Sequence, residues 1–240
     1  MADERFFMQT GRKTVITGHY GSGKTEFAVS LAMLLANENV GRLAIIDLDI
    51  VNPYFRSRER RETLKDNGVA VYGSLYNYEV TAEIPALGAD ARAPLEDKSC
   101  RVIIDAGGND SGALVLNQFS KYFSDGDTTV LAVVNANRPD TSRLEGALDH
   151  IASIESATGL TVNGVVNNCH LLRETTAATV IKGHRLCMEV CAATGKRLWC
   201  DCYPDGIVDP QKLPRLSGRL MPLGLYMRPT WLDVPLRGSV

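Results

Sequence analysis

The sequence has neither a strong net charge nor a long apolar run, and both absences exclude whole classes of protein. Its 240 residues carry a formal net charge of −2 at a pI of about 6.1, so global charge favours neither nucleic acid nor a membrane surface. No stretch approaches the roughly 18 uninterrupted apolar residues of a membrane-spanning helix. The first residues contain acids and no apolar segment, so we expect no secretory signal and a cytoplasmic protein.

The cysteines lack the pattern of a disulfide scaffold or a complete metal site. Six cysteines in a chain of this size are expected to be reduced thiols. Cys200 and Cys202 have the most metal-like spacing, but no second pair completes the four ligands of a zinc or iron–sulfur site. Packing as buried thiols is favoured, and a cysteine site shared between two copies stays open.

Apolar strand-like runs alternate with helical patterns along the chain. The runs cover residues 15–17, 43–47, 101–105, 129–134, 160–166 and 197–200, and helical patterns cover 27–35, 142–157 and 174–193. Gly159 and Gly195 follow the last two helices as expected stops. The pattern predicts an α/β fold with a mostly parallel, twisted sheet and helices on both faces.

We expect one nucleotide-binding domain over residues 12–210, with no internal repeat. Residues 1–11 are interpreted as a flexible N-terminus, and 68–98 as an insertion. Residues 211–240 are rich in proline, which breaks helices, so we expect this tail to pack on the domain or on a partner.

Residues 18–25 form a complete phosphate-binding loop, Gly-His-Tyr-Gly-Ser-Gly-Lys-Thr. It lies between an apolar strand and a helix, the context in which this motif is specific. Its glycines let backbone N–H groups turn toward phosphate oxygens at a helix N-terminus. Lys24 is expected to reach the β- and γ-phosphates, and the Thr25 hydroxyl to bind Mg²⁺.

Carboxylates that could serve Mg²⁺ follow two of the predicted strands. Asp105 ends an apolar strand and is followed by two glycines, as in a Walker B strand. Asp47 and Asp49 alternate at the end of another strand and so share one side of it. Mg²⁺ prefers oxygen ligands. Hydrolysis of a nucleotide phosphate also needs a positioned water molecule, and Asp49 could orient that water.

These motifs resemble the SIMIBI class of P-loop NTPases, and most closely the CobQ/CobB/MinD/ParA nucleotide-binding domains. The resemblance implies an ATPase in which Lys24, Asp49 and Asp47 are catalytic and Thr25, Asp47 and Asp105 serve Mg²⁺. It also implies switch segments at 50–55 and 106–111. The expected nucleotide contacts are Gly18, Gly21, Ser22, Gly23, Lys24, Thr25, Glu26, Asn167, Pro204 and Asp205.

Two departures from the resembled families bear on function. His19 stands where MinD/ParA relatives carry a second lysine that reaches across the dimer, and His19 could replace it only in part. After Asn167, Asn168 and His170 stand where guanine-reading relatives have lysine and aspartate, so ATP is favoured over GTP.

The resemblance favours an Mg·ATP-dependent switch that works as a homodimer on an unidentified protein partner. Neither nucleic acid nor a membrane anchor is expected. Two alternatives stay open. One is a metallochaperone or cluster-assembly NTPase. The other is an ATP-dependent ligase or kinase of the dethiobiotin synthetase or cobyrinate diamide synthase type.

Overall fold

The computed structural model describes residues 10–38, 40–48, 60–73, 91–108, 115–213, 216 and 219–227. Its strands are β1 (Lys13–Thr17), β2 (Arg42–Asp47), β3 (Val69–Gly73), β4 (Cys100–Asp105), β5 (Thr128–Val134), β6 (Gly164–Asn167), β7 (Arg197–Pro204) and β8 (Leu220–Leu223). They form one sheet in the order β3-β2-β4-β1-β5-β6-β7-β8, and every neighbouring pair is parallel. The predicted α/β fold is confirmed, and within the described residues the sheet is wholly parallel.

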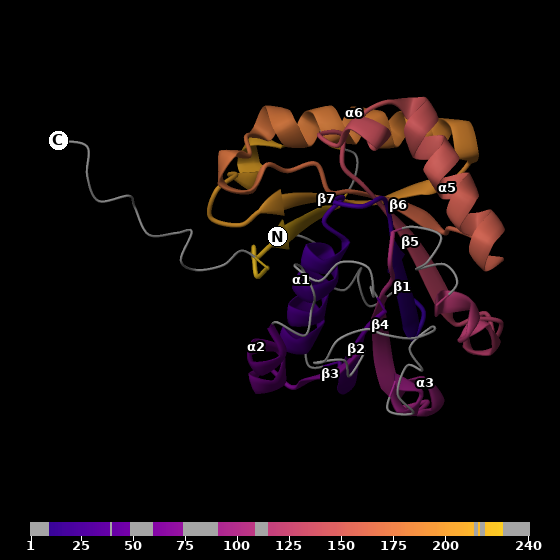
Figure 1. The fold of residues 1–240 in the computed structure, drawn as a ribbon. Coiled ribbons are helices and arrows are strands. Elements are labelled where there is room, and N and C mark those ends of the chain that lie inside the picture. The colour runs from indigo at the N-terminus through magenta and orange to yellow at the C-terminus, as the bar shows by residue number, and fades with distance from the viewer. Residues whose placement is uncertain are drawn as a thin grey trace, which may run out of the picture.

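Helices cover both faces of this sheet (Figure 1). They are α1 (Lys24–Asn37), α2 (Arg61–Asp66), α3 (Ala93–Glu96), α5 (Leu144–Thr158) and α6 (Ala177–Thr194), with short 3₁₀ turns η4 (Ser120–Tyr122), η5 (Pro139–Thr141), η6 (Leu172–Glu174) and η7 (Pro210–Lys212). The helices α5 and α6 end at Gly159 and Gly195, both left-handed with φ near 70°, as the sequence predicts.

Alternation along the strands builds two cores. Val15 packs with α5 and α6 on one face, whereas its neighbour Ile16 packs with α1 on the other. Successive side chains of a strand point to opposite faces, so strands covered on both sides are apolar at nearly every position. This explains why the central strands appear in the sequence as continuous apolar runs.

The structure adds detail at two places of the predicted domain organisation. The expected insertion at 68–98 contains the edge strand β3 at its start and α3 near its end, and residues 74–90 lie outside the described part. The segment after residue 210, expected to pack on the domain or a partner, contains β8, which pairs with β7 and extends the same sheet. Residues 1–9 and 228–240 are not described, so the expectations for them stay untested.

Two smaller differences concern the late strands. Strand β6 begins only at Gly164, so residues 160–163 are not part of the strand that we predicted from residue 160. Strand β7 extends to Pro204, four residues beyond the predicted end. Among the described helices, none combines the length and apolarity needed to cross a membrane.

Candidate functional site

The phosphate-loop motif adopts the backbone that its glycines predict. Gly21 and Gly23 have φ values of 73° and 85°, and Gly23 directly precedes α1. Such left-handed residues strongly favour glycine. The Ser22 N–H donates to the His19 carbonyl at 3.0 Å, and Lys24 Nζ lies 3.4 Å from the same oxygen. The loop therefore closes on itself at the N-terminus of α1, where the helix dipole favours anions.

Gly108, beyond the end of β4, meets this loop closely. A Cβ atom at Gly108 would lie 2.3 Å from the Gly18 oxygen and 2.8 Å from Lys24 Nζ. No side chain fits at those distances, so glycine allows the segment after β4 to lie against the loop. Of the predicted second switch, residues 106–108 are described and 109–111 are not, so that prediction stays untested.

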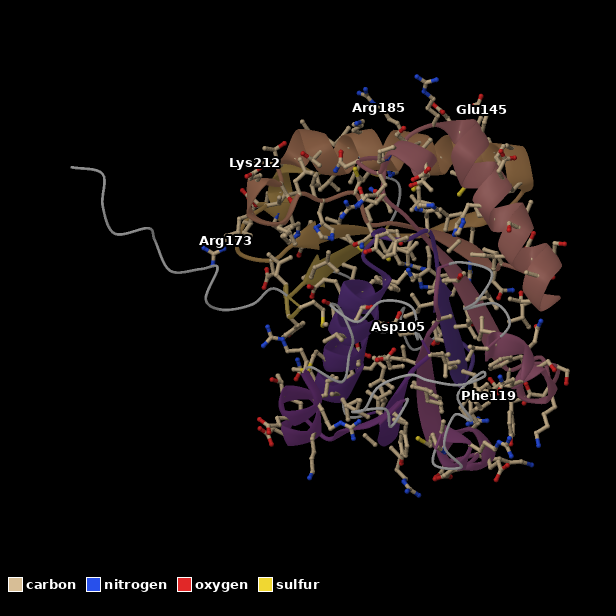
Figure 2. The ribbon with its side chains drawn as sticks, in the orientation of Figure 1. Asp105, Phe119, Glu145, Arg173, Arg185 and Lys212 are labelled. Atoms are coloured by element: carbon tan, nitrogen blue, oxygen red, sulfur yellow. The ribbon has the colours of Figure 1, made fainter. Side chains whose placement is uncertain are left out.

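The two predicted Mg²⁺ carboxylates end adjacent strands. Asp47 on β2 and Asp105 on β4 are register partners, and Asp105 is also paired with Ile16 just before the loop. Both aspartates are buried, with exposures of 2% and 0%. Figure 2 labels Asp105 near the centre of the molecule, whereas Glu145 and Arg185 lie on its outer surface.

These carboxylates and the loop fit a magnesium–nucleotide site. Carboxylate and hydroxyl oxygens are the donors that Mg²⁺ prefers, and carboxylates become buried at such an edge only where a cation or hydrogen bonds compensate them. Asp47, Asp105 and Thr25 supply these donors. Asp49, the predicted water-positioning residue, lies outside the described residues, as do residues 50–55.

Asn167, the predicted adenine contact, is hydrogen-bonded within the protein. It is fully buried, and its amide nitrogen donates to the Val180 carbonyl at 3.0 Å and to Asp201 at 2.7 Å, while its oxygen accepts from the Cys169 N–H at 3.2 Å. Burial raises the pKa of Asp201, and the hydrogen bonds from Asn167 and His184 oppose that rise. Protein groups thus occupy the hydrogen-bonding atoms of this side chain, and the prediction that Asn167 contacts adenine stays untested.

The next residue, Asn168, contacts the phosphate loop instead. Its amide nitrogen donates to the carbonyls of Ser22 and Gly23 at 2.8 and 3.2 Å. Its buried oxygen has no hydrogen-bond partner among the described residues. Asn168 thus ties the end of β6 to the loop at the end of β1. The sequence signal for it was the pair of asparagines that follows a buried apolar strand.

Arg138 and two histidines also lie beside the loop, and the sequence did not reveal this. Arg138, in the segment after β5, donates from Nε to the Gly21 carbonyl at 2.6 Å. His150 on α5 lies beside His19, and His170 after β6 lies near Gly23. Burial is the main reason that the pKa of His150 and that of His170 are each lowered to about 4, so both rings are neutral at pH 7.

Glu26, a predicted nucleotide contact, holds the C-terminal part of the chain. Its carboxylate accepts from the backbone N–H groups of Tyr226 and Met227 at 2.6 and 3.0 Å. Burial raises the pKa of Glu26, and these hydrogen bonds oppose the rise. This carboxylate is therefore engaged by the segment after β8. The same end of the sheet carries Pro204 and the exposed Asp205, whose N–H donates to the Leu223 carbonyl at 3.0 Å.

The cysteines form no evident metal centre. All six are free thiols, and Cys200 and Cys202 are both fully buried on β7. Burial raises the pKa of the Cys202 thiol well above its ordinary value. In the part of the chain that is described, no three His, Cys, Asp or Glu side chains converge as a metal-holding group.

Comparison with known proteins identifies the fold. No protein-family model matches the sequence, and a search of curated proteins found no match. Among solved structures, the chain is similar to the cell division protein FtsY of Thermotoga maritima, with a TM-score of 0.54 and 16% identity, covering 85% of this chain and 67% of that one. It is also similar to chloroplast FtsY of Physcomitrella patens, with a TM-score of 0.54 and 20% identity, covering 84% and 63%.

The chain therefore spans about two thirds of the length of these two proteins. At such identities the likeness concerns the fold and does not separate the CobQ/CobB/MinD/ParA proteins from other members of the class. The likeness shows a shared fold, and this is the fold that the resemblance to the SIMIBI class implies. This chain has the fold of the SIMIBI-class P-loop NTPases.

Proposed function

We propose that this protein is a Mg²⁺-dependent, ATP-binding and ATP-hydrolysing molecular switch of the MinD/ParA-like type that acts on a partner protein. One observation carries the proposal: the phosphate loop follows β1, where Ile16 is paired with Asp105 on β4, and Asp105 is paired in turn with Asp47 on β2. A loop of this shape favours phosphate, and oxygen donors beside it favour Mg²⁺.

Each residue of the site has a role in this proposal. Lys24 and the loop amides hold the phosphates, while Thr25, Asp47 and Asp105 serve the metal. Asp49 positions the attacking water. Phosphoryl transfer depends mostly on positioning and charge stabilisation, so these groups suffice for slow hydrolysis.

The preference for ATP rests on the segment after β6. Residues 169–171 are Cys-His-Leu and supply no carboxylate to accept the two hydrogen bonds that guanine offers. A site that lacks the partner of a base discriminates against that base. We expect Mg·ATP to bind more tightly than Mg·GTP, and a competition titration measures the ratio.

Switching implies a change that a partner can detect. We propose a cytoplasmic homodimer that forms or changes when ATP is bound. In this proposal Gly108 and its neighbours respond to the presence of the γ-phosphate. Sedimentation with and without a hydrolysis-resistant ATP analogue tests this step. A mass that stays the same in both states would count against a nucleotide-dependent dimer.

Calorimetry with Lys24→Ala tests the nucleotide site itself. Loss of a charge-assisted phosphate contact is expected to weaken Mg·ATP binding by roughly 100-fold. Lys121→Ala is the matched control, because Lys121 lies near the amino ends of the strands, away from the loop. This variant should bind Mg·ATP as the unaltered protein does. Equal affinity of Lys24→Ala and the control, or no binding by the unaltered protein, would contradict the proposal.

A further inference from the structure

Residues 224–227, which we name the C-terminal strap, are held on the first turn of α1 by a single carboxylate. The Tyr226 N–H donates to Glu26 Oε1 at 2.6 Å, and the Met227 N–H donates to Glu26 Oε2 at 3.0 Å. Both oxygens of the carboxylate are therefore bonded to the strap, and only 6% of Glu26 is exposed. Hydrogen bonds from backbone N–H groups to a charged carboxylate are among the stronger ones in proteins.

Other contacts of the strap support these two bonds. The Gly224 N–H donates to Ser30 Oγ at 3.2 Å, one turn further along α1. Leu225 has a φ of 50°, in the left-handed region that a leucine seldom adopts, and Met227 is buried in the same core as residues of α1. A strained backbone of this kind persists only where the surrounding contacts hold it. The strap is therefore specifically attached to α1.

The carboxylate that holds the strap lies in the same helical turn as two residues of the proposed nucleotide site. Glu26 directly follows Lys24 and Thr25, and these three residues begin α1. In the proposed function Lys24 contacts the phosphates and Thr25 serves Mg²⁺. A carboxylate so close to the phosphates opposes their binding, because like charges repel more strongly where solvent is excluded. The direction in which the Glu26 carboxylate is held therefore affects nucleotide affinity.

We propose that the C-terminal strap is a positioning element of the nucleotide site, which keeps the Glu26 carboxylate on the strap and away from bound phosphates. This inference rests on the proposed function, because it requires a nucleotide in the loop. The strap does not contact the nucleotide in this proposal. It acts through Glu26, by compensating the negative charge with two N–H donors and by fixing the direction of the side chain.

Release of the strap has a defined consequence in this arrangement. The carboxylate of Glu26 loses both N–H donors and becomes an unpaired negative charge in the turn that receives the phosphates. Nucleotide therefore binds more weakly when the strap is released. Because such coupling is reciprocal, bound nucleotide must in turn oppose release of the strap by the same factor.

Two substitutions at one position test the proposal. Tyr226→Pro removes the N–H that donates to Glu26, whereas Tyr226→Ala keeps this N–H and removes only the ring. Calorimetry with a hydrolysis-resistant ATP analogue and Mg²⁺ should show about tenfold weaker binding for Tyr226→Pro and little change for Tyr226→Ala. Adding Glu26→Gln to Tyr226→Pro should restore most of the affinity, because no charged carboxylate is then left unpaired. A strap that only stabilised the fold would not allow this rescue.

Amide hydrogen exchange tests the reciprocal effect without any variant. Saturating the unaltered protein with the analogue and Mg²⁺ should slow exchange at Tyr226 and Met227 by about tenfold and leave Gly195, at the end of α6, unchanged. Unchanged exchange at Tyr226 and Met227 in protein that binds the analogue would overturn the inference. Full affinity of a folded Tyr226→Pro protein, or a loss that Glu26→Gln does not reverse, would also overturn it. Absence of any binding by the unaltered protein would instead contradict the proposed function.

Discussion

The two ends of the parallel sheet differ in whether their buried polar groups are paired within the protein. At the amino ends of β1, β4 and β5, a cavity of about 430 Å³ is lined by both basic and acidic side chains. Arg12 donates there to the carbonyls of Leu95, Asp97 and Cys100 at 3.0, 3.1 and 2.9 Å, and the buried Lys13 pairs with Asp125. These cations are neutralised or hydrogen-bonded by the protein itself.

At the carboxyl ends, several buried polar atoms have no hydrogen-bond partner among the described residues. Ser22 Oγ, Asn168 Oδ1, His150 Nε2 and His170 Nε2 have no hydrogen bond within the described residues, whereas Thr128 Oγ1 is such an atom at the amino end. Buried polar groups are normally satisfied, so the two ends differ in kind. The comparison teaches that the polar groups of the amino end stabilise the fold, whereas the carboxyl end is where we propose that nucleotide binds.

The sharpest test of this comparison changes one glycine at the binding end. Gly23→Ala places a Cβ atom 2.4 Å from Asn168 Nδ2, at a φ of 85°. We expect nucleotide affinity to fall by roughly 100-fold or more, because the loop must move away from the shape that holds phosphate. A calorimetric titration measures the loss.

Gly41→Ala is the matched control for that change. Gly41 has a φ of 86°, almost that of Gly23, but nothing lies within 4 Å of a Cβ placed there. It should cost about 1 kcal/mol of unfolding free energy and leave affinity unchanged. Similar affinities for the two variants would show that the close contact with Asn168 does not matter.

The stabilising end is tested with Arg12→Ala. Its guanidinium bridges three carbonyls of the segment before β4, so its loss should lower the free energy of unfolding by about 3 kcal/mol. Denaturant unfolding measures this, with the exposed Arg185→Ala as control. Nucleotide affinity should change less than twofold, and a large loss of affinity in a folded Arg12→Ala protein would break the division between the two ends.

Two adjacent asparagines, Asn167 and Asn168, allow the binding role and the stabilising role to be tested at neighbouring positions. Asn168→Ala should weaken nucleotide binding about tenfold, because two bonds to the loop carbonyls are lost. Asn167→Ala should instead lower the free energy of unfolding by about 2 kcal/mol, because Asp201 loses a buried hydrogen bond. The reverse pattern would identify Asn167 as the residue that contacts the nucleotide.

Glu26 gives the smallest expected effect, and it depends on pH. Burial raises its pKa above the ordinary 4.5, so the folded protein holds this proton more tightly than the unfolded chain does. The resulting stability is present below pH 4.5 and is lost as the pH rises through the folded pKa. Relative to Glu26→Gln, the protein should therefore lose stability over that window and change little above it. Denaturant unfolding across pH checks this, and a relative gain would contradict it.

Much of the binding end could be predicted because its signals are local. The phosphate loop lies within eight consecutive residues, and Asp47 and Asp105 each end an apolar strand. Carboxyl ends of parallel strands meet at one edge, so their proximity followed from the fold class. Strands β3 and β8 were missed because each is only partly buried, so neither is a continuous apolar run, and β8 contains a proline.

The sequence by itself determined the phosphate-loop motif and the α/β fold class of this protein, since glycine backbone freedom, apolar runs and the order of motifs act over a few residues. Only the tertiary structure decided which side chains meet. A shift of one residue at a strand end turns a side chain to the other face, so Asn168 rather than Asn167 contacts the loop. Glu26 binds the backbone 200 residues further along the chain, and His19 meets His150 on α5. Such contacts come from packing between distant segments, which no local pattern records.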